Sequence, residues 1–252
     1  MAAALVAGAA SARCETVTAC FDEADRSSYA YPDADGEWRG ATMDLVKELA
    51  RQAGLNLALQ PLPWARCLRL AKATGSDAVD FAFYASANPQ RQAEYAFVGP
   101  VHRVLGGAWF VNRRADLPHA FKSFDTLARY RLCGITGANY AWLKDVGVDR
   151  RVDAGARTVR AAVTKLALGR CDYLLATAEL QASAERHGVS RAELGTLRFA
   201  PYPRATPVAY YLLFNKQQPA YRAAVAAFSA ALERLQHSGA AERQYRDYGL
   251  AP

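Results

Sequence analysis

The chain has 252 residues, of which 52% are hydrophobic, 11% aromatic and 22% charged, and this composition is typical of a folded globular protein rather than a disordered chain. The net charge of +7 comes from basic residues scattered singly and in pairs, so we expect no nucleic-acid partner. No apolar run approaches the roughly 18 to 20 residues that a membrane span needs, which excludes an integral membrane protein.

The N-terminal residues 1–12 carry no charge and end in Ala10-Ser11-Ala12, the small-x-small pattern of a signal-peptidase site. We interpret them as a truncated signal peptide; the alternative is a disordered N-terminal tail. A signal peptide predicts an exported, periplasmic protein, in which some of the five cysteines form disulfides. Their number alone does not determine the pairing. There is no CxxC motif, and the four histidines lie far apart, so we expect no metal and no cofactor.

In the first half of the chain, short β-rich runs alternate with helical patterns, which indicates a parallel sheet with crossover helices. The helical pattern is clearest at Thr42–Ala53, where apolar residues recur at i, i+3, i+4 and i+7 before Gly54. The predicted strands of this half are Thr16–Phe21, Leu55–Gln60 and Ala78–Tyr84, and the predicted helices are Thr42–Ala53 and Trp64–Thr74.

The second half repeats this order after an aromatic, glycine-rich passage at Gly106–Val111. One further strand late in the chain suggests that the first lobe is discontinuous. We therefore predict an α/β protein with one lobe from residues 13–103 and 208–252 and another from 104–207. The predicted strands here are Arg131–Thr136, Arg151–Asp153, Cys171–Thr177 and Ala209–Phe214, and the predicted helices are Ala138–Val146, Thr158–Leu168, Pro219–His237 and Ala240–Tyr248.

The order of these segments resembles the bacterial extracellular solute-binding proteins of family 3, the periplasmic receptors of polar amino-acid ABC importers. The resemblance covers nearly all of residues 14–249 and implies the type II periplasmic-binding-protein fold, with two α/β lobes around a central cleft joined by two crossings. It rests on eight short motifs in the family's order: Asp35-Gly36-Glu37-Trp38-Arg39-Gly40 with Met43-Asp44-Leu45; Leu62-Pro63-Trp64-Ala65-Arg66; Val79-Asp80; Asn88-Pro89-Gln90-Arg91 with Phe97 and Pro100; Gly134-Ile135-Thr136-Gly137; Gly169-Arg170-Cys171-Asp172; Tyr211-Leu212-Leu213-Phe214; and Ser238-Gly239.

In such a fold, ligands lie at the carboxyl ends of the strands, so the site is expected just after the predicted strands. The resemblance implies that Arg91 binds the ligand's carboxylate, with Ser86 as a nearby donor. A guanidinium suits this role because its planar fork of donors pairs with both carboxylate oxygens. A solvated surface arginine is the alternative for Arg91.

On the opposite lobe, Asn139 follows a strand and opens a predicted helix, whose free N–H groups can hold the same carboxylate. The alternative is that Asn139 only caps this helix. Thr177 occupies the position where amino-acid receptors of the family place an acid for the α-ammonium. A hydroxyl cannot neutralise an ammonium, so the sequence favours a carboxylate-bearing ligand without requiring an α-amino acid. Glu179 follows two residues later, where strand alternation and the start of a helix do not fix the direction of its side chain.

The remaining candidates for ligand contact are mostly aromatic. Tyr29 and Tyr31 lie in the loop after the first strand, and Trp64 begins a helix near the same edge. Their rings suit stacking on a hydrocarbon, an aromatic ring or a cation. Each ring has core packing as its alternative. Glu23 stands early in the same loop, where an acidic side chain can meet a basic ligand group.

The resemblance also implies a disulfide between Cys133 and Cys171, because this fold places the beginnings of their strands side by side. Cys20 with Cys67 is a second predicted pair. We expect a monomeric, non-enzymatic receptor whose partners are a small-molecule ligand and the permease and ATPase of an ABC importer. The alternatives are a periplasmic enzyme resembling cyclohexadienyl dehydratase, with Glu23 or Glu179 as its acid or base, and a detached sensory domain.

Overall fold

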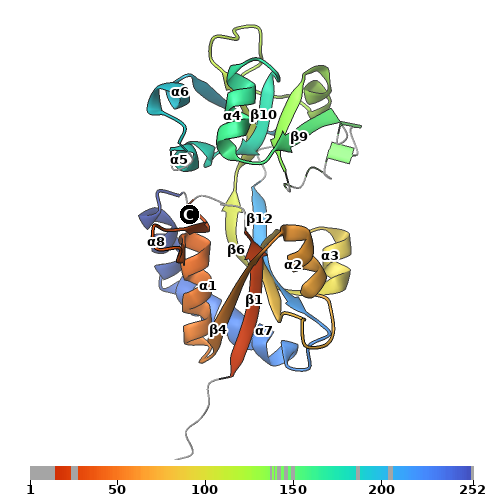
Figure 1. Cartoon of the computed structure of the whole chain (residues 1–252), viewed down its shortest axis with the longest axis vertical. Coiled ribbons are helices and arrows are strands. Elements are labelled where there is room, and N and C mark those ends of the chain that lie inside the picture. Colours follow the sequence, from red (N-terminus) through yellow and green to blue (C-terminus); the bar gives the residue numbers. More distant parts are fainter. Residues whose placement is uncertain are drawn as a thin grey trace, which may run out of the picture.

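The computed structural model describes residues 15–23, 28–136, 138, 140, 143–144, 147–148, 151–185, 188–203 and 207–250. The chain is divided between two bodies, each built around one five-stranded sheet, and Figure 1 shows them one above the other. We call the body of the N-terminal strands lobe 1 and the other lobe 2. The expectations for the signal segment 1–12 and for Asn139 fall outside the described residues.

Lobe 1 is built around a mixed sheet with the strand order β4-β1-β5-β12-β6. β1 runs parallel to β4 and β5, whereas β12 runs antiparallel to β5 and β6. The strands are β1 Thr16–Asp22, β4 Asn56–Leu62, β5 Phe81–Ser86, β6 Tyr95–Val104 and β12 Val208–Asn215, with a small hairpin of β2 Tyr31–Pro32 and β3 Trp38–Arg39. The helices are α1 Ala41–Gln52, α2 Trp64–Leu70, α3 Pro89–Glu94, α7 Tyr221–His237 and α8 Ala240–Asp247.

Lobe 2 has the strand order β11-β7-β10-β8-β9. β8 runs parallel to β9 and β10, and β7 runs antiparallel to β10 and β11. The strands are β7 Gly106–Val111, β8 Leu132–Ile135, β9 Val152–Ala156, β10 Tyr173–Thr177 and β11 Leu197–Pro201. The helices are the 3₁₀ helix η1 Phe124–Arg129, α4 Val159–Ala167, α5 Leu180–Ala184 and α6 Arg191–Gly195.

The core of lobe 1 lies between its sheet and the long helix α7. Phe81 of β5 stacks on Phe214 of β12 with ring centroids 4.7 Å apart, and Phe228 of α7 meets Phe81 edge-on at 5.3 Å. All three side chains are fully buried. Each contributes on the order of 2 kcal/mol through burial of apolar surface, so this cluster holds the late strand β12 in the first lobe.

The chain crosses between the lobes next to β6 and again before β12. β6 of lobe 1 ends at Val104, and β7 of lobe 2 begins at Gly106. Leu105, between them, accepts a hydrogen bond of 2.9 Å from the N–H of Ala178, which follows β10. β6 and β12 are neighbours in the lobe 1 sheet, so both crossings leave from adjacent strands (Figure 1).

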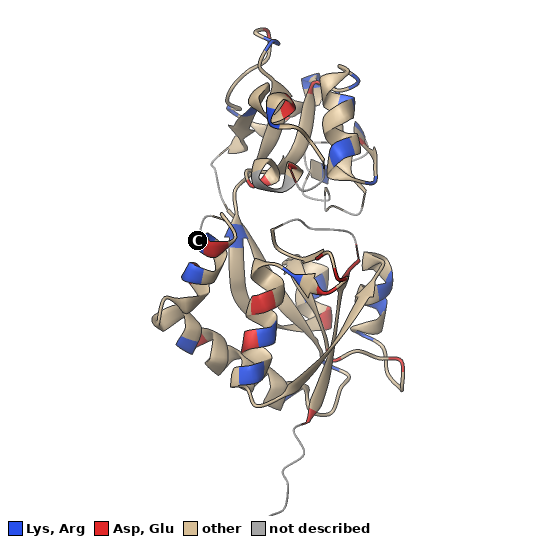
Figure 2. Cartoon of the chain, turned by 60° about the vertical axis from the view of Figure 1, so that its left-hand side comes forward, with Lys and Arg blue, Asp and Glu red and all other residues tan. Residues whose placement is uncertain are grey.

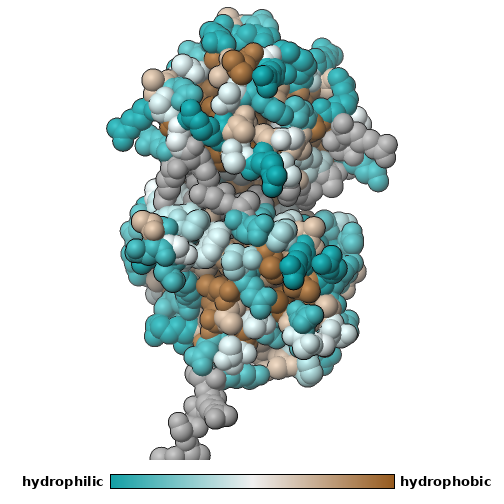
Figure 3. All heavy atoms as spheres, in the orientation of Figure 1, coloured by the Kyte–Doolittle hydropathy of each residue, from teal (hydrophilic) through white to brown (hydrophobic). Residues whose placement is uncertain are grey.

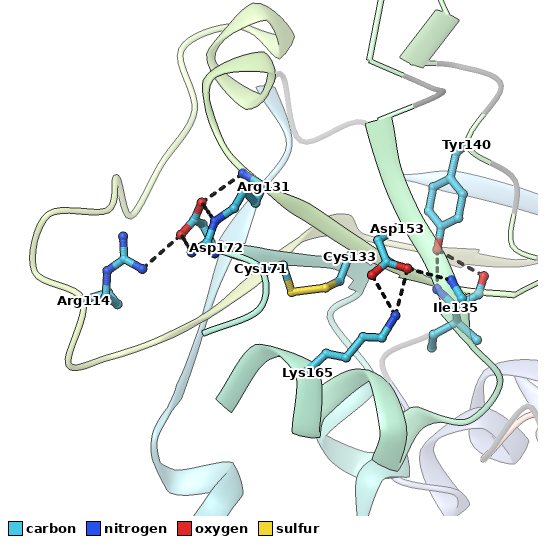
Figure 4. The surroundings of a disulfide bond; sticks show 10 residues. Arg114, Arg131, Cys133, Ile135, Tyr140, Asp153, Lys165, Cys171 and Asp172 are labelled. Atoms are coloured by element: carbon cyan, nitrogen blue, oxygen red, sulfur yellow. Dashed lines mark hydrogen bonds and ion pairs between the residues drawn. A yellow bond between two sulfur atoms is a disulfide. The ribbon is translucent and has the colours of Figure 1, made fainter. Parts of the chain in front are cut away.

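Both predicted disulfides are formed. Cys20–Cys67 ties β1 to α2 in lobe 1, and Cys133–Cys171 joins the start of β8 to a residue two positions before β10 in lobe 2. Beside the second bond, the buried carboxylate of Asp172 accepts hydrogen bonds from Arg131 Nη2 at 2.8 Å and from Arg114 Nη1 at 3.0 Å (Figure 4). Hydrogen bonding to Arg131 lowers the pKa of Asp172 to about 2.

The surface of the two lobes is mixed in charge and largely polar. Basic and acidic residues both occur on each lobe in the view of Figure 2, and the face in Figure 3 is mostly hydrophilic, with some hydrophobic residues visible. Among the described residues, no helix combines the length and apolar character that crossing a membrane requires.

Several elements differ from the predicted ones. β6, β7 and β11 were not predicted, and α2 ends at Leu70 rather than at Thr74. The predicted helix Ala138–Val146 falls on a stretch of which only a few residues are described.

Candidate functional site

A hollow lies at the carboxyl ends of β1 and β5, on the side of lobe 1 that faces lobe 2. Its volume is about 90 Å³. A single water needs about 10 to 15 Å³ on the same measure, so there is room for a small molecule. We call it the Arg91 hollow. Its lining comes from lobe 1 except for Ala138 and consists of Phe21, Asp22, Ala30, Trp64, Phe83, Tyr84, Ala85, Ser86, Arg91, Ala138 and Tyr210.

The cap of the short helix α3 positions Arg91. The side chain of Asn88 at the N-cap accepts a 2.8 Å hydrogen bond from the backbone N–H of Arg91, and Pro89 occupies the first helical position. Proline suits this position because its ring fixes φ in the helical range and no N–H partner is lost there. The Asn-Pro pair therefore fixes the backbone from which the arginine side chain returns to the end of β5.

The guanidinium of Arg91 lies between a strand end and an aromatic ring. Its Nη1 donates to the carbonyl oxygen of Ser86 at 2.7 Å and contacts Ser86 Oγ at 3.3 Å. Its Cζ lies 5.7 Å from the ring centroid of Trp64. No described residue accepts a hydrogen bond from Nε or Nη2. Partial burial lowers the pKa of Arg91, so a bound anion would relieve the cost of keeping this cation in the hollow.

Tyr84 stands in an irregular stretch of β5. In the pairing of β5 with β12, Ala85 lies opposite Tyr211 and Phe83 opposite Leu212, so Tyr84 is the extra residue of a bulge. Its φ of 64° is in the left-handed region, which costs a residue with a Cβ about 1 to 2 kcal/mol. Its ring stacks on that of Tyr210 with centroids 4.4 Å apart and planes 16° apart.

The start of α1 holds Tyr29 in the core rather than in the open loop that we expected. The backbone N–H groups of Thr42 and Met43 both donate to the carbonyl oxygen of Tyr29 at 3.1 Å. This contact needs glycine at position 40, where φ is 126° and a Cβ would lie 2.5 Å from the carbonyl atoms of Tyr29. The Tyr29 ring is 4% exposed, and its hydroxyl shares a 2.9 Å hydrogen bond with His102 Nε2.

Aromatic rings continue from the Arg91 hollow into the core of lobe 1. The Tyr84 ring lies 5.1 Å from that of Tyr29, which lies 4.8 Å from His102, and His102 stacks on Tyr245 at 4.4 Å. Burial lowers the pKa of His102 to about 4, so its imidazole is neutral at pH 7. Tyr210 belongs to β12 and His102 to β6, so this row of rings contacts both strands that lead to lobe 2.

Glu179 of lobe 2 reaches toward the same row. Burial raises the pKa of the Glu179 carboxyl and outweighs the lowering effect of the nearby Thr177 and Tyr29. Its Oε2 is buried and accepts no hydrogen bond from any described residue. Thr177 is half-buried, and its carbonyl oxygen accepts a 2.9 Å hydrogen bond from Trp109 Nε1. Neither residue is in the lining of the Arg91 hollow.

The structure thus brings three of the predicted ligand contacts together in the hollow: Arg91, Ser86 and Trp64. Glu23 is exposed, and the acid in the hollow is its neighbour Asp22, the last residue of β1. Tyr31 lies in β2, where its ring meets Tyr248 edge-on at 6.5 Å. It takes no part in the lining.

Sequence reasoning identified the strand ends but not every residue there. Asp22 could have been found because it follows Phe21 directly, at a predicted strand end. Tyr84 and Tyr210 could not, since their positions depend on the bulge and on the pairing of two strands that lie far apart in the sequence.

The chain matches one family model, that of the bacterial extracellular solute-binding proteins of family 3, over residues 19–251. Comparison with the curated proteins found no match. The chain is similar in structure to a histidine kinase sensor domain with similarity to periplasmic binding proteins, with a TM-score of 0.75, 19% identity and coverage of 95% of this chain and 99% of the other.

Two further solved structures are similar over most of their length. One is the arginine-, lysine-, histidine-binding protein ArtJ of Geobacillus stearothermophilus, with a TM-score of 0.71, 19% identity and coverage of 94% of this chain and 97% of the other. The second is an ancestral amino acid-binding protein, a precursor of cyclohexadienyl dehydratase, with a TM-score of 0.69, 18% identity and coverage of 92% and 95%. At such identities the likeness establishes the fold, which is that of the periplasmic binding proteins.

Proposed function

The chain belongs to the bacterial extracellular solute-binding proteins of family 3, and from that premise we propose that it captures a small carboxylate-bearing solute in the Arg91 hollow for an ABC importer. The lobes close over the ligand, and contacts on both sides favour the closed state. The permease and the ATPase are the partners that read this state. The setting for this role is the periplasm, reached through the signal segment 1–12.

The observation that carries the proposal is the arrangement of the guanidinium of Arg91. One nitrogen is held on Ser86 at 2.7 Å, while Nε and Nη2 have no acceptor among the described residues. A carboxylate can pair with these two nitrogens in bidentate fashion, which makes a shorter and stronger contact than a neutral hydrogen bond. Trp64 covers the guanidinium from one side and limits its access to water.

We further propose that the ligand need not carry an α-ammonium. Thr177, at the position of the expected acid, carries no charge and is not part of the lining. Asp22 is the acid in the lining, so a basic group on the ligand, if there is one, meets this carboxylate on lobe 1. Substitution of Asp22 shows whether the ligand carries a basic group that this carboxylate recognises.

Two other roles on the same fold are distinguishable. A sensor role is suggested by the similarity to the kinase sensor domain, and it would use the same closure to signal rather than to deliver solute. A dehydratase role needs an acid or base beside the arginine. Glu179 has the raised pKa that suits an acid, but it lies outside the lining of the hollow, so its position favours binding over catalysis.

A thermal-shift screen of the purified protein tests the proposal. The compounds are straight-chain carboxylates, the matching primary amides, the matching amines and free α-amino acids. A compound at 100 times its Kd stabilises the protein by roughly 2.7 kcal/mol, so we expect carboxylates to raise the Tm and amides to leave it unchanged. Equal Tm shifts from carboxylates and amides would rule out the proposal that the site recognises a carboxylate.

The same screen on Asp22→Asn decides the question of the ammonium. If α-amino acids bind the wild type more tightly than the simple carboxylates do, and Asp22→Asn removes that advantage, the ligand does carry a recognised ammonium. If simple carboxylates bind at least as well in both proteins, the site recognises no α-ammonium, in keeping with a threonine rather than an acid at position 177.

A further inference from the structure

The backbone at position 84 has the conformation of a glycine, yet the residue is tyrosine. Every other described residue with a positive φ is a glycine. A β-bulge whose extra residue is left-handed normally has glycine at that place, because a Cβ is strained there. Bulges next to binding sites serve to redirect a side chain. The structure therefore keeps a strained residue at a position that lines the Arg91 hollow.

The ring of Tyr84 is held firmly in that position. It stacks on Tyr210 at 4.4 Å, and the ring of Tyr29 lies 5.1 Å away. Tyr29 is itself buried and tied to the start of α1. A ring packed in this way does not swing aside at low cost, so it forms a fixed wall of the hollow.

The wall faces the same space as the carboxylate-binding group. Tyr84, Ser86 and Arg91 all line the hollow. A glycine at position 84 would leave the volume of a phenol ring open on the lobe 1 side. The length of a ligand whose carboxylate is held by Arg91 is therefore limited by how much of this space the ring fills.

We propose that Tyr84 is a specificity-determining residue that restricts the hollow to short carboxylates. This inference rests on the function proposed above and adds the size class of the ligand. The ring acts by exclusion: it occupies the space that the distal part of a longer carboxylate would need.

Titration calorimetry with two ligand series tests the proposal. The probes are straight-chain carboxylates from acetate to octanoate and the matching primary amides, measured on the wild type, Tyr84→Gly and Tyr84→Phe. Glycine suits the left-handed bulge, so relief of backbone strain offsets part of the packing lost with the ring, and Tyr84→Gly is expected to fold. Tyr84→Phe keeps the ring and is the matched control for the loss of the hydroxyl.

In the wild type we expect affinity to fall beyond the short members of the series. In Tyr84→Gly we expect each additional methylene that enters the opened space to improve Kd about fourfold, so the preference for short over long carboxylates shrinks by at least tenfold. Tyr84→Phe should keep the wild-type preference. An unchanged ratio in Tyr84→Gly, or an equal weakening of all lengths in that variant, would overturn the proposal.

Failure of the inference can be distinguished from failure of the proposed function. Carboxylate binding with no change of length preference in Tyr84→Gly leaves Arg91 in its role and removes Tyr84 from the specificity of the site. Binding of amides in place of carboxylates removes the role of Arg91, while the amide series still reports whether position 84 limits length.

Discussion

The substitution Arg91→Lys tests the binding site at its charged centre. The guanidinium has two tasks, since Nη1 donates to Ser86 at 2.7 Å while Nε and Nη2 have no acceptor among the described residues. A lysine ammonium keeps the charge but cannot form the planar fork. It either stays on the Ser86 carbonyl and offers the ligand one donor, or it follows the ligand and leaves that carbonyl unpaired.

In either case the ligand loses part of its contact with position 91, and the loss of binding free energy can be estimated. Truncating one partner of a buried charge pair costs about 2 to 5 kcal/mol, and retention of the charge places Arg91→Lys at the lower end. A loss of about 2 kcal/mol corresponds to roughly a thirtyfold increase in Kd. The unliganded protein should lose less than about 1 kcal/mol of stability, because Arg91 is only half-buried.

Titration calorimetry with the tightest carboxylate from the screen is the assay, and Arg69→Lys is the matched control. Arg69 is exposed on α2 and lies outside the hollow, so its variant should bind as the wild type does. Burial that lowers the pKa of Arg91 would also lower that of a lysine there, whose ordinary pKa is only about 10.4. The binding defect of Arg91→Lys should therefore grow as the pH rises from 7 to 9. If both variants bind within threefold of the wild type, the assignment of Arg91 is wrong.

Three predictions concern stability. The double substitution of Cys133 and Cys171 by alanine opens a cross-link with a sequence separation of 38 and should cost about 4 kcal/mol on chain-entropy grounds, measured by urea unfolding; a loss below about 1 kcal/mol would contradict it. The pKa of Asp172, about 2 in the fold against 3.8 normally, contributes about 2 kcal/mol above pH 4 that disappears as the pH falls toward 2, so Asp172→Asn should destabilise the protein at pH 7 much more than at pH 2. Gly40→Ala should destabilise by about 3 kcal/mol or more because its Cβ would lie 2.5 Å from Tyr29, and a Tm within about 2 °C of the wild type would refute the close contact.

The spacing of apolar residues predicted the helices whose pattern lies within one short stretch of sequence. The apolar stripe of α1 and the long helix α7 are where the spacing placed them, with ends shifted by one or two residues. β6 and β7 were not predicted because glycine and proline interrupt their patterns, as at Gly99-Pro100 in β6. Their pairing with other strands overrides that local signal.

In the site, too, some residues follow from a short stretch of sequence, and others depend on contacts between distant segments. Arg91 and Ser86 were predicted from the resemblance to the family, whose motif at residues 88–91 lies within a few residues of the end of β5. Tyr29 was expected to face a ligand, but hydrogen bonds from the first turn of α1 draw it into the core. The position of Tyr84 follows from a register shift against β12, about 125 residues later, and no local pattern contains that information.

The strand order of lobe 1 has a consequence for the order in which the chain can assemble. β12 lies between β5 and β6, so in the described sheet β6 is held only by a strand that comes about 100 residues after it. All the strands of lobe 2 lie in one uninterrupted stretch before β12. A chain that emerges from its N-terminus first can thus finish lobe 2 while lobe 1 is still open. The lobe that begins first is completed last, and β6 remains an unpaired edge, exposed to aggregation, until the final quarter of the protein has appeared.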